Sequence, residues 1–295
     1  MTGNVADHPL TKKESIVTRR NFLLGSTAAA AGMALYSGEV ARHEISILTH
    51  AISIANLPDA FHNFRIAQIS DIHFDEFTEP AFLRQVITRI NSLQPDLTLL
   101  TGDFVSMGPL GPGFAMGAMH RCLDALRGIA GPRFACMGNH DSILGAPLLH
   151  PIFASYDTPL LMNGHVPIER AGQRFWLCGV GDFMTEIPNL DLTIPERPDG
   201  PVLLMCHAPD YADHVITHPR GHLVDFMFSG HTHGGQVRIP FLRPYHLPEG
   251  GRKYIEGLFR FNQMQLYVNK GIGTVGLPFR LNCPPEITLF TLQRA

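Results

Sequence analysis

Side chains that commonly bind metal ions follow five apolar segments of this 295-residue sequence. Oxygen and imidazole ligands without thiolate suit Mn, Fe, Zn, Ni or Co. In chain order, these residues are Asp71, His73, Asp103, Asn139, His207, His231 and His233. In α/β proteins, ligands bind at the carboxyl ends of the strands, so we expect the five loops to converge on one metal centre.

The spacing within the first and last motifs predicts which side chains share an ion. Asp71 and His73 are two residues apart, and on an extended segment such side chains point the same way. His231 and His233 have the same spacing and serve one ion or two neighbouring ions. Alone, each motif is more typical of a solvated surface loop than of a metal site, whereas the complete ordered set favours a metal site.

A glycine precedes three of these ligands. Gly102, Gly138 and Gly230 allow backbone conformations that other residues avoid and let the neighbouring ligand approach closely. A carboxylate shared by two ions, for which Asp103 is the best candidate, holds them about 3.5–4 Å apart in two-metal hydrolytic sites.

The pattern of apolar residues predicts the elements that position these loops. Strands and helices alternate in the first half of the chain, over 64–70, 80–93, 97–101, 114–126 and 133–137. An edge strand is expected within 43–54. Later strands are expected at 165–170, 173–180, 202–206, 223–229, 236–239, 265–269 and 286–292, with a short helix at 211–217. This order favours an α/β fold with two sheets packed face to face and helices outside.

Composition excludes several classes of protein. The formal net charge is -3 and no basic run follows the first twenty residues, which argues against nucleic acid as a partner. Five cysteines without a CxxC pair indicate neither a disulfide framework nor a zinc knuckle. Cys136, Cys178 and Cys206 lie in apolar runs and are expected to be small buried hydrophobes.

The N-terminus resembles an export signal. Arg19 and Arg20 precede Phe22 and Leu23, and the uncharged, Ala-rich stretch 24–36 follows. The paired arginines resemble the twin-arginine signal of bacteria and imply that export machinery as a partner. We therefore expect residues 1–40 to be signal and linker, 41–295 to be the catalytic domain, and the location to be periplasmic. The stretch is short for a membrane span, and it either stays as an anchor or is removed.

The ordered motifs SDIH, GD, GNHD, a lone His and GHTHGG resemble those of the calcineurin-like metallophosphoesterases. The resemblance runs over about 64–292. It implies a four-layer α/β sandwich of two mixed sheets flanked by helices, with a dinuclear metal site at the C-terminal ends of strands. By position, it implies one divalent or trivalent ion on Asp71, His73, Asp103 and His233. The second ion would lie on Asp103, Asn139, His207 and His231.

The same resemblance implies a catalytic pair and a reaction. His140 matches the histidine that contacts phosphate and protonates the leaving oxygen, and Asp141 matches a carboxylate that can orient it. The expected reaction is hydrolysis of a P–O bond by a metal-activated water, on a phosphodiester or phosphomonoester. One alternative is a UDP-2,3-diacylglucosamine pyrophosphohydrolase of lipid A synthesis, and another is a non-catalytic metal-binding protein.

Some residues near the motifs leave alternatives open. Asp75 and Glu76 either bind a substrate cation or are solvated, and Arg280 either binds phosphate or forms a structural ion pair. Three further side chains could seat an acyl chain of a lipid-linked substrate or belong to the core, and these are Phe74, Phe77 and Phe104.

Overall fold

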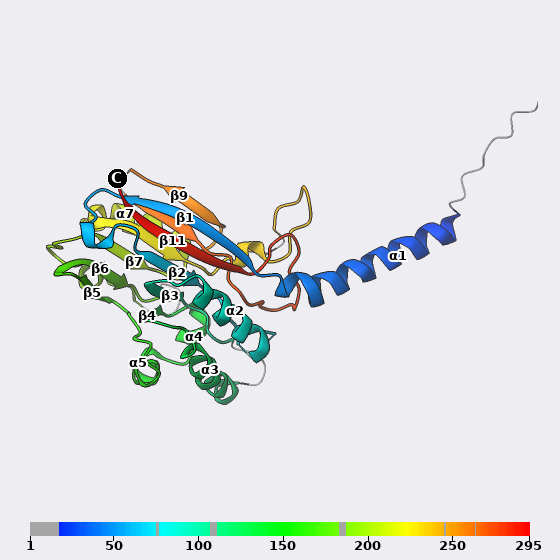
Figure 1. Ribbon diagram of the computed structural model, residues 1–295. Helices are drawn as coiled ribbons and strands as arrows, with labels where there is room; N and C mark the ends of the chain where they lie inside the picture. Colours follow the sequence, from blue (N-terminus) through cyan, green and yellow to red (C-terminus); the bar gives the residue numbers. More distant parts are fainter. Residues whose placement is uncertain (1–17, 75–76, 107–110, 183–186, 245, 263) are drawn as a thin grey trace, which may run out of the picture.

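Two mixed β-sheets pack face to face, and helices cover the outer face of each sheet (Figure 1). The computed structural model describes residues 18–74, 77–106, 111–182, 187–244, 246–262 and 264–295. The expected fold class, a sandwich of two mixed sheets flanked by helices, is confirmed.

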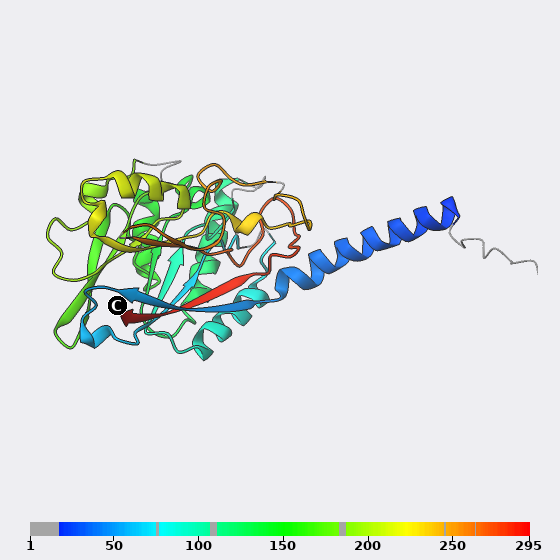
Figure 2. The same cartoon turned by 90° about the horizontal axis from the view of Figure 1, so that it is seen from above.

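The first sheet carries the strands that lead into the first three motifs. In spatial order its strands are β1 (Ser46–Ile54), β11 (Glu286–Arg294), β2 (Arg65–Ile69), β3 (Leu97–Thr101) and β4 (Arg133–Cys136). β2, β3 and β4 run parallel, so their carboxyl ends lie at the same edge of the sheet (Figure 2). β1 is an edge strand, as predicted, and pairs in parallel with β11.

The second sheet carries the strands that lead into the last two motifs. Its strands, in spatial order, are β5 (Gly164–Arg170), β6 (Gln173–Gly179), β7 (Val202–Met205), β8 (Val224–Ser229), β10 (Gln265–Val268) and β9 (Gly257–Arg260). β7 and β8 are parallel neighbours. The predicted hairpin of β5 and β6 turns at Ala171 and Gly172, whose φ angles of 50° and 74° fit a tight two-residue turn.

Alternate residues of the strands fill two different layers of the core. On β2, Ile66 packs between the sheets with Phe226 and Phe228 of β8, whereas Ala67 and Ile69 face the helices. Such alternation follows from the two-residue repeat of a strand. The inner strands β2 and β3 are therefore buried on both faces, whereas the edge strand β1 exposes alternate residues.

The helices contribute one apolar face each. α2 (Pro80–Ser92) buries five side chains at helical spacing, namely Phe82, Leu83, Val86, Ile87 and Ile90. Full burial of each stabilises the fold by roughly 1.5–3 kcal/mol. Pro80 lies in the first turn, where its missing N–H costs nothing. α3 (Pro112–Leu126) and α5 (Ala146–Ser155) pack on the same sheet, and α6 (Leu190–Thr193) and α7 (Ala212–Thr217) on the other.

One predicted strand is wrong. The segment 236–239 forms only a single bridge, between Val237 and Leu281. Gln236 has a φ of 51°, and Pro240 has no N–H to donate, so neither suits a continuous ladder. β9 was not expected from the sequence. The expectation for the cysteines is confirmed, since all five lie in the described part of the chain, are buried and belong to no disulfide.

The N-terminal helix α1 (Arg19–Leu35) extends away from the two sheets (Figure 1). It buries none of its side chains. Chain contact with the body begins at Ser37 and Gly38, where the Ser37 carbonyl accepts a hydrogen bond from the Arg280 amide. Within the described ranges, no helix combines the length and the apolar character needed to cross a membrane. The boundary near residue 40 stays a prediction.

Candidate metal centre

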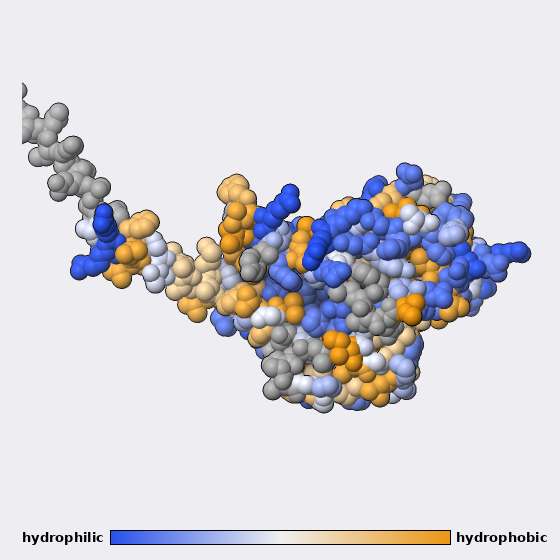
Figure 3. Space-filling view, turned by 180° about the vertical axis from the view of Figure 1, so that it is seen from behind, coloured by the Kyte–Doolittle hydropathy of each residue, from blue (hydrophilic) through white to orange (hydrophobic). Residues whose placement is uncertain are grey.

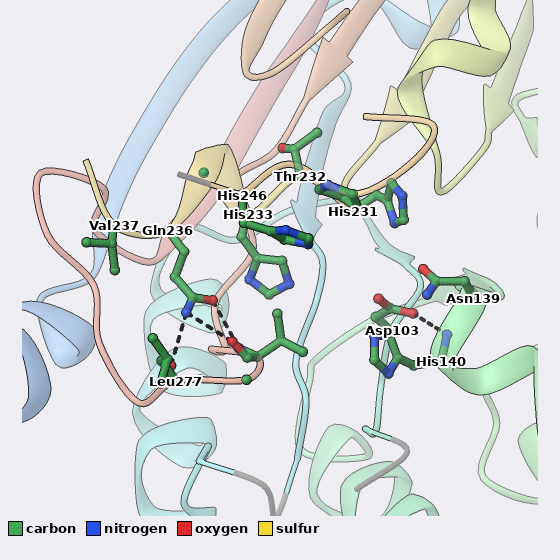
Figure 4. Close-up of a pocket in the computed structure, with 14 residues that line it drawn as sticks. Asp103, Asn139, His140, His231, Thr232, His233, Gln236, Val237, His246 and Leu277 are labelled. Atoms are coloured by element: carbon green, nitrogen blue, oxygen red, sulfur yellow. Dashed lines mark hydrogen bonds between the residues drawn. The ribbon is translucent and has the colours of Figure 1, made fainter. Parts of the chain in front are cut away.

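The structure brings the seven predicted ligands together where the two sheets meet. Asp71 and His73 follow β2, Asp103 follows β3, and Asn139 begins the short helix α4 (Asn139–Ser142) after β4. From the second sheet, three imidazoles follow β7 and β8, namely those of His207, His231 and His233. Figure 4 shows Asp103 and Asn139 facing the imidazoles of the second sheet. Binding of metal by each of the seven residues stays a prediction.

Asp103 lies between two sets of nitrogen ligands. Its Oδ2 is 3.2 Å from Nε2 of His207 and 3.6 Å from Nε2 of His73. The side chains of Asp71, His73 and His233 form one group whose ligand atoms lie within 4.8 Å of one another. Asp103, His207 and His231 form another such group. The carboxylate of Asp103 lies close enough to contact both groups, and its role as a shared ligand stays a prediction.

The motif backbones are not extended. Five candidate ligands have positive φ, with values of 50° at Asp71, 46° at His73, 55° at Asp103, 73° at His231 and 50° at His233. The extended geometry assumed for the two-residue spacings is therefore wrong, although each motif still delivers its side chains to the centre. Non-glycine residues in this region are strained, and such strain concentrates at functional sites.

The three glycines act mainly by leaving room. Gly102 alone of the three has positive φ, at 93°. A Cβ at Gly138 would overlap the carboxylate of Asp103, and a Cβ at Gly230 would overlap the side chains of Ser70 and Asp71. Close approach of backbone to ligand therefore explains Gly138 and Gly230.

Hydrogen bonds to neighbouring groups orient three of the imidazoles. His207 Nδ1 lies 2.7 Å from the Thr101 carbonyl, which leaves Nε2 for a cation. His231 Nε2 lies 2.7 Å from the Glu249 carbonyl, which leaves Nδ1. His73 Nδ1 lies 2.6 Å from the Ser106 hydroxyl. Such partners fix the tautomer and the ring orientation of metal-binding histidines.

Sequence reasoning missed these supporting groups. Ser106 is 33 residues from His73, and Thr101 is 106 residues from His207. The partners of His207 and His231 are backbone carbonyls, which carry no side-chain signature.

Buried polar atoms without partners test whether a cation fits. Among the described residues, Asn139 Oδ1, His207 Nε2 and His233 Nδ1 are buried and have no hydrogen-bond partner. Nε2 of His73 and Nε2 of His233 are 3.1 Å apart. Two imidazole nitrogens approach so closely when a proton or a cation lies between them. The donor set of carboxylate, amide and imidazole therefore fits metal ions.

Burial and neighbouring charges set the protonation of the centre. Burial lowers the pKa of His73 to about 3 and that of His231 to about 4, so both are neutral at pH 7. Burial opposes charge on His207 as well, but the carboxylates of Asp103 and Asp71 outweigh it and raise its pKa to about 10. Burial raises the pKa of Asp71 to about 6. Without metal, a proton on His207 therefore offsets one of the two carboxylate charges.

His140 lies beside the ligands at the pocket wall. Its ring centroid is 4.9 Å from that of His73, and its backbone N–H donates to Asp103 Oδ1 at 3.0 Å. It is partly exposed, whereas the aspartate and histidine ligands are buried, and it lines the pocket. This position suits a group that contacts substrate, and the catalytic role stays a prediction.

Asp141 links the loop after β3 to the loop after β4 through hydrogen bonds. Its carboxylate accepts hydrogen bonds from the backbone amides of Phe104, Val105 and Gly138, at 2.9, 3.3 and 3.1 Å. Burial and the charge of Asp103 raise the pKa of Asp141 to about 8. These bonds hold the segment after Asp103 against the start of α4. Its predicted role in orienting His140 stays a prediction.

A pocket of about 360 Å³ opens over the centre. Asp103, Asn139 and His140 form one side of it, and His231 and His233 lie across from them (Figure 4). Beyond the polar floor, the wall includes three apolar side chains, namely Val237, Val275 and Leu277.

Arg280 is structural, although not through an ion pair. Its side chain is fully buried and donates to the backbone carbonyls of Lys270, Gly271, Gly273 and Cys283. The sequence suggested either phosphate binding or a structural ion pair for Arg280. In the structure, its side chain instead supports the loop behind Asp71.

The outcome differs among the other residues that the sequence singled out. Phe74 and Phe104 belong to the buried core beside α2 and α3. Asp75 and Glu76 lie outside the described residues.

A known protein family matches the part of the chain that contains the metal centre. The family described as calcineurin-like phosphoesterase matches residues 64–235, which include all seven candidate ligands. That range covers more than half of the chain.

Two relatives match over nearly the whole chain, and a third matches over about four fifths of it. An uncharacterized metallophosphoesterase of Bacillus subtilis is 31% identical, over 94% of this chain and 98% of its own. Phosphodiesterase YaeI of Escherichia coli is 30% identical, over 94% of this chain and 100% of its own. A protein of Chlamydia trachomatis named UDP-2,3-diacylglucosamine pyrophosphatase is 29% identical, over 79% of this chain and 86% of its own.

Proposed function

This chain belongs to the calcineurin-like phosphoesterase family, and on that premise we propose that it is a two-metal phosphodiesterase. Hydrolysis of phosphoester bonds follows from the family. The observation that carries the finer proposal is the position of Asp103, whose Oδ2 lies within 3.6 Å of imidazoles from both ligand groups. The similarity to a relative named as a phosphodiesterase supports it.

The ligand groups assign residues to two ions. Asp71, His73 and His233 would hold one ion, and Asn139, His207 and His231 would hold the other. Asp103 would contact both. When bound, the ions supply Lewis-acid chemistry, since they neutralise phosphate oxygens and acidify water.

His140 is proposed to protonate the leaving oxygen. It lies at the pocket wall beside the ligands, so it can reach a phosphoester that rests on the centre. General acid catalysis contributes about 10²–10⁴-fold to a rate and matters most for leaving groups that are poor without a proton. Asp103 accepts the His140 backbone N–H and so keeps this residue close.

We expect His140→Ala to lower turnover of an alkyl phosphodiester by about 10²–10⁴-fold and that of bis-p-nitrophenyl phosphate much less. Initial rates after Mn²⁺ loading, with elemental analysis of each preparation, measure this. Metal content should stay as in the wild type. His246→Ala is the matched control, because His246 lines the same pocket and is not among the candidate ligands.

Two results would contradict the assignment. An unchanged alkyl-ester rate in His140→Ala would remove the acid role. Full metal occupancy in Asp103→Ala would remove the shared-ligand role.

A second candidate reaction is cleavage of a pyrophosphate in a lipid-linked nucleotide sugar. The apolar wall of Val237, Val275 and Leu277 and the Chlamydia trachomatis relative favour it. Release of UMP from UDP-2,3-diacylglucosamine, beside phosphodiester hydrolysis by the same preparation, distinguishes the two reactions.

We also propose that the N-terminal segment directs twin-arginine export to the periplasm. Arg19 and Arg20 begin α1, and this helix leaves all of its side chains exposed to the export machinery. A segment without packing contacts to the folded body is free to be recognised separately.

A further inference from the structure

Four large apolar side chains project from the surface next to the pocket. The exposed fraction is 54% for Ile239, 106% for Phe241, 65% for Leu242 and 58% for Leu277. We refer to these four residues as the apolar ridge. Exposed apolar side chains that gather at one place mark interaction sites more often than scattered ones do.

Hydrogen bonds join the two loops that make up the apolar ridge. The Gln236 side chain donates to the carbonyls of Val275 and Leu277, at 3.1 and 3.0 Å. The Arg238 amide donates to the Leu281 carbonyl at 2.9 Å. The base of the ridge is therefore tied down, although its side chains are exposed.

The apolar ridge continues the wall of the metal pocket. Leu277 belongs to both, and Val237 lines the pocket two residues before Ile239. In Figure 4, Val237 and Leu277 lie on the far side of the pocket from Asp103 and Asn139. The apolar side of the pocket is therefore continuous in sequence with the exposed side chains of the ridge.

The apolar ridge also lies near the base of α1. The Arg280 amide, three residues after Leu277, donates to the Ser37 carbonyl just after that helix. In Figure 1, the gold loop that contains residues 239–242 stands beside the end of α1, and Figure 3 shows an apolar projection there. α1 itself exposes Phe22, Leu23 and Leu24.

The size and charge of the apolar ridge favour a lipid bilayer as its partner. A stable protein interface buries about 800 Å² on each side. Four side chains on two neighbouring loops supply less than this, whereas a few apolar side chains suffice to enter the interface of a membrane. Arg243 is exposed and follows Leu242 directly, so a positive charge lies where anionic headgroups would be.

We propose that the apolar ridge inserts into a bilayer and presents the metal centre to a phosphoester whose apolar chain stays in the membrane. The substrate part of this inference rests on the proposed function, and the membrane contact does not. The apolar wall would receive the lipid chain, and the metal floor would receive the phosphate.

Sedimentation of the full chain with vesicles of phosphatidylcholine and phosphatidylglycerol tests the membrane contact. We expect Phe241→Ser with Leu242→Ser to weaken binding at least about 10-fold, because two large side chains lose their burial. Hydrolysis of soluble bis-p-nitrophenyl phosphate should stay unchanged. The matched control is Ile187→Ser with Leu192→Ser, which removes two exposed apolar side chains of similar size elsewhere.

A spectroscopic readout separates insertion from adsorption. Trp176 is the single tryptophan of the chain, so Phe241→Trp adds one emission that should shift to the blue with vesicles. The wild-type emission should not shift.

Each remaining outcome overturns a defined part of the inference. If the variant Phe241→Ser with Leu242→Ser binds vesicles as well as the control variant does, the apolar ridge is not the membrane contact. A ridge variant that loses self-association in light scattering, with no vesicle binding by the wild type, assigns the ridge to a second copy instead. Normal vesicle binding without any phosphoester hydrolysis would support the membrane contact of the apolar ridge and contradict the proposed phosphodiesterase function.

Discussion

The protonation state of His207 determines the net charge of the metal centre. Its Nε2 is 3.2 Å from Asp103 and 4.0 Å from Asp71, and it is fully buried. Two buried carboxylates need compensation by a positive charge. In the metal-free protein a proton on His207 provides part of it, and in the loaded protein the cations would provide it.

Metal binding should therefore release about one proton at pH 7.5, because the pKa of His207 is raised to about 10. His73 and His231 are already neutral there, with pKa values lowered to about 3 and 4. The apparent affinity should rise with pH between 6.5 and 8.5, as fewer protons compete for Nε2. Calorimetry in buffers of different ionisation enthalpy measures the release.

His207→Gln should remove most of this proton release, while His246→Ala should keep it. Binding heats that do not depend on the buffer in the wild-type protein would show that the assigned protonation is wrong.

At the scale of elements, the turn after β3 places the shared carboxylate. Gly102 has a φ of 93°, and a Cβ there would lie 2.6 Å from the Gly138 amide nitrogen and from His207 Nδ1. This turn therefore brings β3, β4 and β7 closer than any side chain would permit.

Gly102→Ala should lower the free energy of unfolding by about 3 kcal/mol, from backbone strain and overpacking together. It should also reduce bound metal, since Asp103 and His207 must move apart. Urea unfolding with and without Mn²⁺ gives the first value, and elemental analysis gives the second.

Gly113→Ala is the matched control. Gly113 lies in α3, and a Cβ added there would have no atom within 4 Å, so this change should be neutral or stabilising by up to about 1 kcal/mol. Equal stability of Gly102→Ala and wild type would contradict the packing argument.

At the scale of the whole molecule, folding and export are predicted to be separable. α1 buries none of its side chains, whereas Ser37 and the residues after it contact the body. A chain that lacks residues 1–35 should therefore keep its free energy of unfolding within about 0.5 kcal/mol of the full chain. Its metal content and soluble activity should also be unchanged.

The same truncation should leave the protein in the cytoplasm. Arg19→Lys with Arg20→Lys in the full chain should do likewise, because the paired guanidinium groups are the proposed address. Fractionation of cells that express each form measures this. Periplasmic protein from either form, or a clear loss of stability on truncation, would contradict the prediction that folding and export depend on different parts of the chain.

The sequence determined the elements and the residues with metal-binding chemistry. Short apolar runs predicted β2, β3 and β4 nearly to the residue, and the helical spacing of Phe82, Val86 and Ile90 predicted α2. These features are local, and the repeat of each element sets them directly. For the segment after Gln236, local apolar pattern was misleading, because φ and the missing N–H of Pro240 prevent a ladder.

Only the tertiary structure decided how the ligands meet. The left-handed backbone at Asp71 and His73, the Ser106 partner of His73 and the support by Arg280 all depend on segments that are distant in the chain. The apolar ridge likewise joins residues from two loops. Such features arise from packing between separate segments, and no periodicity within one segment carries that information.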